Sequence, residues 1–141
     1  IRTFDPEMRE KLHDRFRTIV ANTAASNGAT ADIQLPYSAH YPVTFNDPAL
    51  TSQMLETLER TAGKDNVELI DAITGAEDFS FFANEVPGLF LFVGGKPLSV
   101  PANFNVSHHT PDFYIDESGM KLGLRILMNL ALDYMDKAST Q

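Results

Sequence analysis

Apolar residues recur at helical spacing near the start of the chain. Asp5 and Pro6 are typical of a helix start, because a carboxylate caps free backbone N–H groups and proline suits the first helical position. The apolar positions that follow are Met8, Leu12, Phe16, Ile19 and Val20. Asn27-Gly28 then supplies residues suited to a positive φ, which is common where helices end. This pattern predicts a helix from Pro6 to about residue 26.

The segments on either side of this helix have the pattern of strands. Residues 29–35 alternate between apolar and polar side chains, which is typical of a strand with one wet face. Residues 1–4 also have strand character. We therefore expect strand–helix–strand over residues 1–40, with an open antiparallel sheet packed on one helix.

The pattern changes at a hinge near residues 40–46. Asp47-Pro48 repeats the helix-start chemistry, and Gly63 ends the apolar stripe that follows. Beyond it we expect a short strand at 66–70, a short helix at 77–84 and a strand at 89–93. The last of these is apolar at every position, as in a parallel strand buried on both faces. Helices alternating with strands favour an α/β layer.

The end of the chain predicts a loop and then a long helix. Residues 95–115 contain three prolines and are expected to form the loop. The helix should run from about Glu117 to about Met135. Its apolar residues nearly encircle it, so we expect it to be largely buried.

Composition narrows the class of protein. Eleven basic and nineteen acidic residues among 141 give a net charge of −8, which argues against binding to a nucleic-acid backbone. The longest uninterrupted apolar run, 89–93, is far shorter than a membrane span. We therefore expect a soluble protein. The absence of cysteine excludes a thiolate site and leaves the compartment open, with a small preference for the cytoplasm. The chain begins at Ile1, and we expect it to be a piece of a longer protein.

Polar clusters follow the predicted strands, where open α/β sheets bind ligands. Glu77 and Asp78 open the predicted short helix, Gly94-Gly95 follows strand 89–93, and residues 105–112 lie in the long loop. Two interpretations of Glu77 and Asp78 remain open. They are either acidic residues of a helix first turn, or metal ligands or carboxylates that orient a metal ligand.

The histidine pair 108–109 is the most suggestive of these groups. Neighbouring side chains of an extended segment point to opposite faces, so only one of the pair should face a given cleft. Either histidine could also be an exposed loop residue without function. Thr110-Pro111 stiffens the loop, which favours a ligand role. His13, near the polar side of the first helix, is expected to face solvent, and His40 has no evident partner.

These residues are too few for a catalytic metal centre. A zinc site needs three or four ligands, and the chain offers one good histidine and one or two carboxylates. No Gly-x-Ser-x-Gly elbow indicates a serine hydrolase, and no glycine-rich phosphate loop is present.

Three motifs together resemble the M20 metallopeptidases. They are Gly75-Ala-Glu-Asp-Phe-Ser-Phe81, Val86-Pro-Gly-Leu-Phe-Leu-Phe-Val-Gly-Gly95, and His109-Thr-Pro-Asp-Phe113 with Asp116-Glu117. The combination is similar to the amidohydrolase branch, which contains hippurate hydrolases, N-acyl-amino-acid amidohydrolases and auxin-conjugate hydrolases. Residues 1–4 and the helix after them resemble the lid-domain segment of the same enzymes.

The resemblance implies a fold and a set of site residues. It implies a zinc-peptidase-like α/β catalytic domain carrying an inserted α+β lid and dimerisation domain. Residues 1–42 would be the C-terminal part of the lid, and residues 43–141 the C-terminal part of the catalytic domain. His109 would be the last metal ligand, with Glu77 and Asp78 in the metal-site environment. The glutamate general base and the other ligands would lie upstream, so no residue of this chain is assigned a catalytic role.

The resemblance also implies an activity. The parent enzyme would use two Zn²⁺ or Mn²⁺ ions and a metal-activated water to attack the amide carbonyl of an N-acyl amino acid. It would form a homodimer through its lid. The chain would be a C-terminal fragment that is inactive as it stands. The alternative is a non-enzymatic binding or dimerisation module on the same scaffold.

Overall fold

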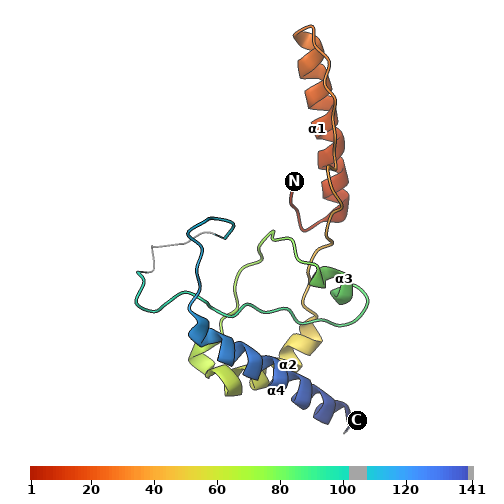
Figure 1. The fold of residues 1–141 in the computed structure, drawn as a ribbon. Helices are drawn as coiled ribbons and strands as arrows, with labels where there is room; N and C mark the ends of the chain where they lie inside the picture. The colour runs from red at the N-terminus through yellow and green to blue at the C-terminus, as the bar shows by residue number, and fades with distance from the viewer. Residues whose placement is uncertain (102–107, 140–141) are drawn as a thin grey trace. The chain divides into compact units, whose positions relative to one another are not determined.

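The computed structural model describes residues 1–101 and 108–139. Its α-helices are α1 (Pro6–Ser26), α2 (Pro48–Ala62), α3 (Phe79–Ala83) and α4 (Met120–Ser139), and its short 3₁₀ helices are η1 (Lys64–Asn66) and η2 (Glu117–Gly119) (Figure 1). The segment 102–107 of the predicted loop, which includes Asn105, Val106 and Ser107, lies outside the described residues.

The chain forms two compact units. Unit 1 consists of Ile1–Asp47 and Ile70–Phe90, and unit 2 of Pro48–Leu69 and Leu91–Gln141. Each is described by itself below.

The start and stop signals of the first two helices are confirmed. The Asp5 carboxylate accepts hydrogen bonds from the backbone N–H groups of Glu7 and Met8, at 2.8 and 3.1 Å. Gly28 and Gly63 follow α1 and α2 with φ of 68° and 89°, a region that glycine enters without a steric cost. The later helices differ at their ends from the prediction, because α3 is shorter than 77–84 and α4 continues to Ser139.

The predicted strands are not found among the described residues. A strand needs the backbone of a neighbouring strand as its hydrogen-bonding partner, and at Phe90 a side chain takes that place. Asn46 Nδ2 donates to the Phe90 carbonyl and the Phe90 N–H donates to Asn46 Oδ1, both at 2.7 Å. The expected α/β layer, and the sheet beside α1, are therefore not confirmed by the described part of the chain.

The exposed and buried faces of α1 are the reverse of the prediction. Its apolar stripe is exposed (Met8, Leu12, Phe16, Ile19), whereas His13 is only 5% exposed. The reason is that the segment after α1 returns alongside the helix (Figure 1), where the Arg17 guanidinium donates to the Leu35 carbonyl. The expectation that His13 faces solvent is wrong.

Unit 2 is built on the pair α2 and α4. Its buried apolar side chains are Met54 and Ile126, and a row of hydrogen bonds lies beside them. Thr57 Oγ1 and Arg60 Nη2 each donate to Asp133 Oδ2 at 2.5 Å, and Asn129 Nδ2 donates to Thr61 Oγ1 at 3.0 Å. These polar contacts fix how the two helices are aligned, because they join particular positions of α2 to particular positions of α4.

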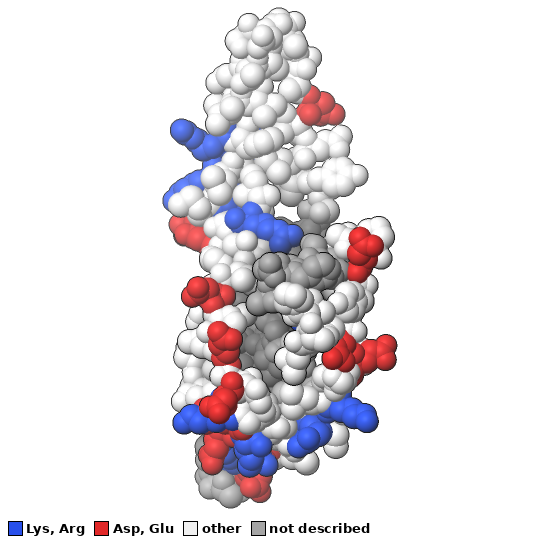
Figure 2. Space-filling model, turned by 90° about the vertical axis from the view of Figure 1, so that its left-hand side faces the viewer, with Lys and Arg blue, Asp and Glu red and all other residues white. Residues whose placement is uncertain are grey.

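The expectation that the last helix is largely buried is wrong for the described residues. Ile126 is the buried residue of α4, and several large apolar side chains are exposed (Met120, Leu124, Leu127, Met128, Leu132, Met135). Packing against α2 covers one side of the helix and leaves the others open. On the face drawn in Figure 2, uncharged side chains cover more surface than the scattered charged ones. Among the described residues, no helix combines the length and apolarity needed to cross a bilayer.

Acid should weaken the α2–α4 pair through Asp133. The hydrogen bond from Thr57, followed by the bond and charge of Arg60, lowers the pKa of the Asp133 carboxyl below its ordinary value. A carboxyl with a lower pKa in the folded state stabilises the fold above the unfolded pKa, about 4. That contribution is lost as the pH falls through the folded value.

Urea unfolding at about pH 6 and about pH 3 measures this effect. The unfolding midpoint of the parent chain should fall on acidification, and Asp133→Asn should reduce the fall. Glu56→Gln is the control, because it makes the same charge change at an exposed position of α2. An equal reduction by both variants would contradict the assignment.

Candidate functional site

Glu77 and Asp78 lie at the start of α3 in unit 1. Ser80 is 0% exposed, and its hydroxyl donates to the Glu77 carbonyl at 2.6 Å, which fixes the first turn. The Glu77 carboxylate accepts a long hydrogen bond of 3.4 Å from the Phe79 N–H. Asp78 stands at the N-cap with helical dihedral angles and makes no side-chain cap bond. Of the two carboxylates, Glu77 therefore accepts a hydrogen bond from the start of α3, whereas the side chain of Asp78 is exposed.

Aromatic packing holds α3 in place within unit 1. The Phe79 ring lies 5.7 Å from the Phe90 ring, and the Phe81 ring lies 5.9 Å from the Tyr41 ring. Gly88 suits this close packing, since a Cβ at this position would lie 3.1 Å from the Phe79 ring and would require that ring to shift. The Gly75–Phe81 motif is thus joined to the segment that precedes Gly94.

His108 and His109 form a turn in unit 2. The Phe113 N–H donates to the Thr110 carbonyl at 3.1 Å, and the His108 ring lies 4.8 Å from the Phe113 ring. His109 has φ of 63°, in the left-handed region that non-glycine residues seldom occupy. The expected extended backbone at this pair is therefore wrong, and the argument from alternating faces does not apply. Strained backbone of this kind is concentrated at functional sites, which favours a role for His109.

The segment before α4 is hydrogen-bonded to the backbone of the glycine pair 94–95. The Asp116 N–H donates to the Gly95 carbonyl at 2.7 Å. The Ser118 N–H donates to Asp116 Oδ1 at 2.9 Å, and hydrogen bonds from the Ser118 backbone and side chain lower the pKa of the Asp116 carboxyl. A Cβ on Gly119 would lie 3.0 Å from the Gly94 carbonyl oxygen, so the lack of a side chain at Gly119 allows this close approach.

The predicted site residues do not form a metal centre within the described part of the chain. Glu77 and Asp78 belong to unit 1 and His109 to unit 2. No group of three or more His, Asp or Glu side chains that could hold a metal ion occurs among residues 1–101 and 108–139. The described residues alone therefore do not supply the ligands that a catalytic metal needs. The ligand role of His109 stays a prediction.

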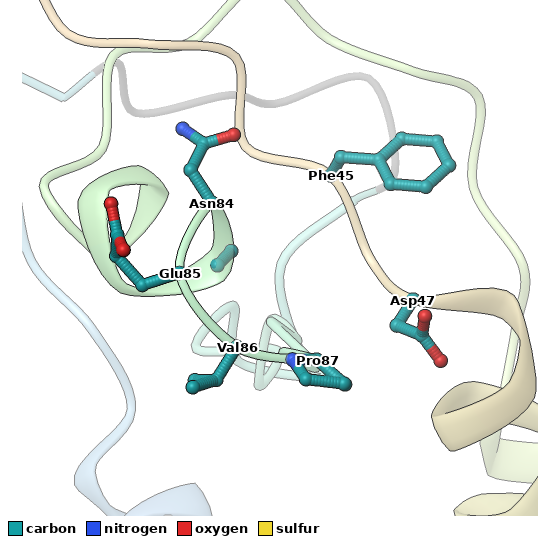
Figure 3. Close-up of a pocket in the computed structure, with 7 residues that line it drawn as sticks. Phe45, Asp47, Asn84, Glu85, Val86 and Pro87 are labelled. Carbon is teal, nitrogen blue, oxygen red and sulfur yellow. The ribbon is translucent and has the colours of Figure 1, made fainter.

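Two cavities in unit 1 were not predicted from the sequence. The smaller, of about 270 Å³, lies between Phe45 and Asp47 on one side and the loop after α3 on the other, where Asn84, Glu85 and Pro87 contribute (Figure 3). The larger, of about 450 Å³, is lined by residues 1–4, 35–44 and 73–76 with Arg9 and His13. No local sequence signal marks either cavity, because each is formed by segments far apart along the chain.

Comparison with known proteins gives one family. The profile of Peptidase family M20/M25/M40 matches residues 5–133. A thermostable carboxypeptidase (carboxypeptidase 2) of Saccharolobus solfataricus is 30% identical over 97% of this chain and 33% of its own length. An IAA-amino acid hydrolase (ILR1-like 4) of Arabidopsis thaliana is 30% identical over 99% of this chain and 32% of its own length.

A third relative has a different named substrate. An N-acetyldiaminopimelate deacetylase of Limosilactobacillus fermentum is 33% identical over 67% of this chain and 24% of its own length. The chain thus spans about a third or less of these curated relatives. No solved structure matches the chain.

Proposed function

Because this chain belongs to Peptidase family M20/M25/M40, we propose that it is the C-terminal portion of a metal-dependent amidohydrolase that cleaves the amide bond of N-acyl amino acids. The observation that carries the proposal is the family match over residues 5–133, which spans all three motifs. The names of its relatives describe hydrolysis of IAA-amino acids, carboxypeptidase activity and deacetylation of N-acetyldiaminopimelate. Each of these activities cleaves an amide bond in a substrate that contains an amino acid.

In this proposal, His109 is the residue that binds metal. Its support is an exposed imidazole on a turn in the left-handed backbone region. Glu77 and Asp78 belong to the metal-site environment, and their support is the exposed Asp78 carboxylate beside the anchored first turn of α3. Two divalent ions, Zn²⁺ or Mn²⁺, would supply an activated water in the whole enzyme. The remaining ligands and the general base would come from the part of the enzyme that this chain does not span.

The domain organisation is proposed on the same basis. Residues 1–42 would be the end of the lid, through which the whole enzyme forms a homodimer, and residues 43–141 the end of the catalytic domain. The exposed apolar stripe of α1 supports a further packing partner for the lid segment. The same stripe supports the second candidate function, a non-enzymatic binding or dimerisation module. A metal motif and a glutamate pair upstream would favour the enzyme over the module.

The isolated chain should not hydrolyse N-acyl amino acids. It lacks a group of metal ligands among its described residues and has no assigned base to activate water. The measurement is release of glycine from hippurate after incubation with Mn²⁺ or Zn²⁺, with circular dichroism to confirm that the helices are formed. Hydrolysis that exceeds a no-protein blank and that is abolished by a chelator would contradict the prediction.

A further inference from the structure

The side chains that line the larger cavity of unit 1 include no acidic residue, which is unusual in this acidic chain. Although the whole chain carries −8, none of the residues that line the cavity is Asp or Glu. The charged and titratable lining side chains are Arg2, Arg9, His13, His40, Tyr37 and Tyr41. The cavity is therefore lined by cationic and neutral groups only, and it offers several donors to a negatively charged ligand.

Two lining residues have buried polar atoms without hydrogen-bond partners. They are His13 Nδ1 and Thr44 Oγ1, and they come from different segments that meet at the same cavity. Nearly all buried polar groups in folded proteins are hydrogen-bonded, so an orphaned pair at one cavity points to a missing partner. His13 is 5% exposed, which places its imidazole away from bulk water.

The neighbouring side chains do not supply that partner. The Glu10 Oε2 atom lies 3.7 Å from His13 Nδ1, which is beyond hydrogen-bond distance. The Arg9 Nε atom donates a long hydrogen bond of 3.4 Å to the other Glu10 oxygen, so the Glu10 carboxylate is an ion-pair neighbour of both Arg9 and His13. Arg2 is already engaged, since its Nη1 donates to the Thr74 carbonyl at 2.8 Å. Arg2 is exposed, whereas Arg9 is half-buried, and the Arg9 guanidinium carries N–H donors besides the Nε that meets Glu10.

We propose that this cavity binds a small oxyanion, held by the Thr44 hydroxyl, the His13 imidazole and the Arg9 guanidinium. Phosphate and carboxylate groups share the required chemistry, since their oxygens accept hydrogen bonds from hydroxyl, imidazole and guanidinium donors. The volume of about 450 Å³ lies within the range of about 300–1000 Å³ found for small-molecule sites. The proposal does not use His109, Glu77 or Asp78, so it stands independently of the proposed enzymatic function.

The test is an NMR titration of the isotope-labelled chain with inorganic phosphate and, in a second arm, with acetate. Ionic strength is held constant with chloride, and the pH is fixed. The His13 imidazole signals should shift in a saturable way, whereas those of His108, which belongs to unit 2, should not. Saturation by phosphate, by acetate or by both supports the proposal, and the stronger arm identifies the preferred anion.

Variants separate donor loss from general damage to the fold. Thr44→Val keeps the shape of the side chain and removes the hydroxyl, and Arg9→Met removes the charge while keeping an apolar stem. Each should weaken binding by about 10–100-fold, as expected when a donor to a charged group is lost. Thr18→Val is the control, because Thr18 is an exposed residue of α1 that does not line the cavity.

Two results would overturn the proposal. One is a His13 shift that grows linearly with either anion, or that chloride alone reproduces. The other is unchanged binding in both Thr44→Val and Arg9→Met, each with a backbone spectrum like that of the parent chain. Because two variants on different segments are used, failure of one to fold leaves the other as the deciding measurement.

Discussion

Under the proposed function, replacing His109 by alanine in the full-length enzyme should remove one metal ion or most of the hydrolytic activity. A lost imidazole ligand changes both the geometry and the charge around a metal ion, and water does not restore either. The measurements are metal content of the purified variant and its rate of hippurate hydrolysis. A parent-like rate and full metal content in His109→Ala would refute the ligand assignment.

His108→Ala is the matched control for this experiment. The His108 ring packs 4.8 Å from the Phe113 ring, so its loss should loosen the turn without removing a ligand. We expect an activity loss of about 10–100-fold at most, as is typical when a group supporting a metal ligand is removed. If His108→Ala is instead the inactive, metal-depleted variant, the assignment is wrong by one residue.

A second substitution at the same position separates the imidazole from the backbone. His109 has φ of 63°, a conformation that asparagine tolerates better than most residues. His109→Asn should therefore keep the turn and still lose metal and activity. Recovery of the parent rate in His109→Asn would mean that the turn, and not the imidazole, is what the enzyme requires.

The helices could be predicted because their signals are local. The Asp5 side chain caps the first turn of the helix that it begins, and Gly63 adopts the positive φ that ends the next one. Strands depend on partners elsewhere in the chain, and the alternation of residues 29–35 says nothing about which backbone they pair with. The Asn46 amide beside Phe90 shows the same limit, because the contact joins residues 44 positions apart.

The candidate site shows the same division between local and distant information. The motif residues that place the chain in its family could be read directly, as the match over residues 5–133 confirms. The burial of His13 could not, since it depends on residues 35–44 and 73–76 returning to the helix to form the cavity. The left-handed turn at His109 was also missed, because neither glycine nor asparagine marks it.

Met54→Ala should destabilise unit 2 much more than Leu55→Ala, a substitution at the next residue of α2. Met54 is 2% exposed, and its removal leaves a cavity where α2 packs against α4, at a cost of about 2–5 kcal/mol in the free energy of unfolding. Leu55→Ala is the control, because Leu55 is 42% exposed and its loss should cost about 1 kcal/mol or less. Both residues lie within the same helix and have helix propensities close to that of alanine, so the difference between the variants measures burial. Urea unfolding midpoints provide the measurement, and equal midpoints for the two variants would mean that α2 does not pack on α4 through Met54.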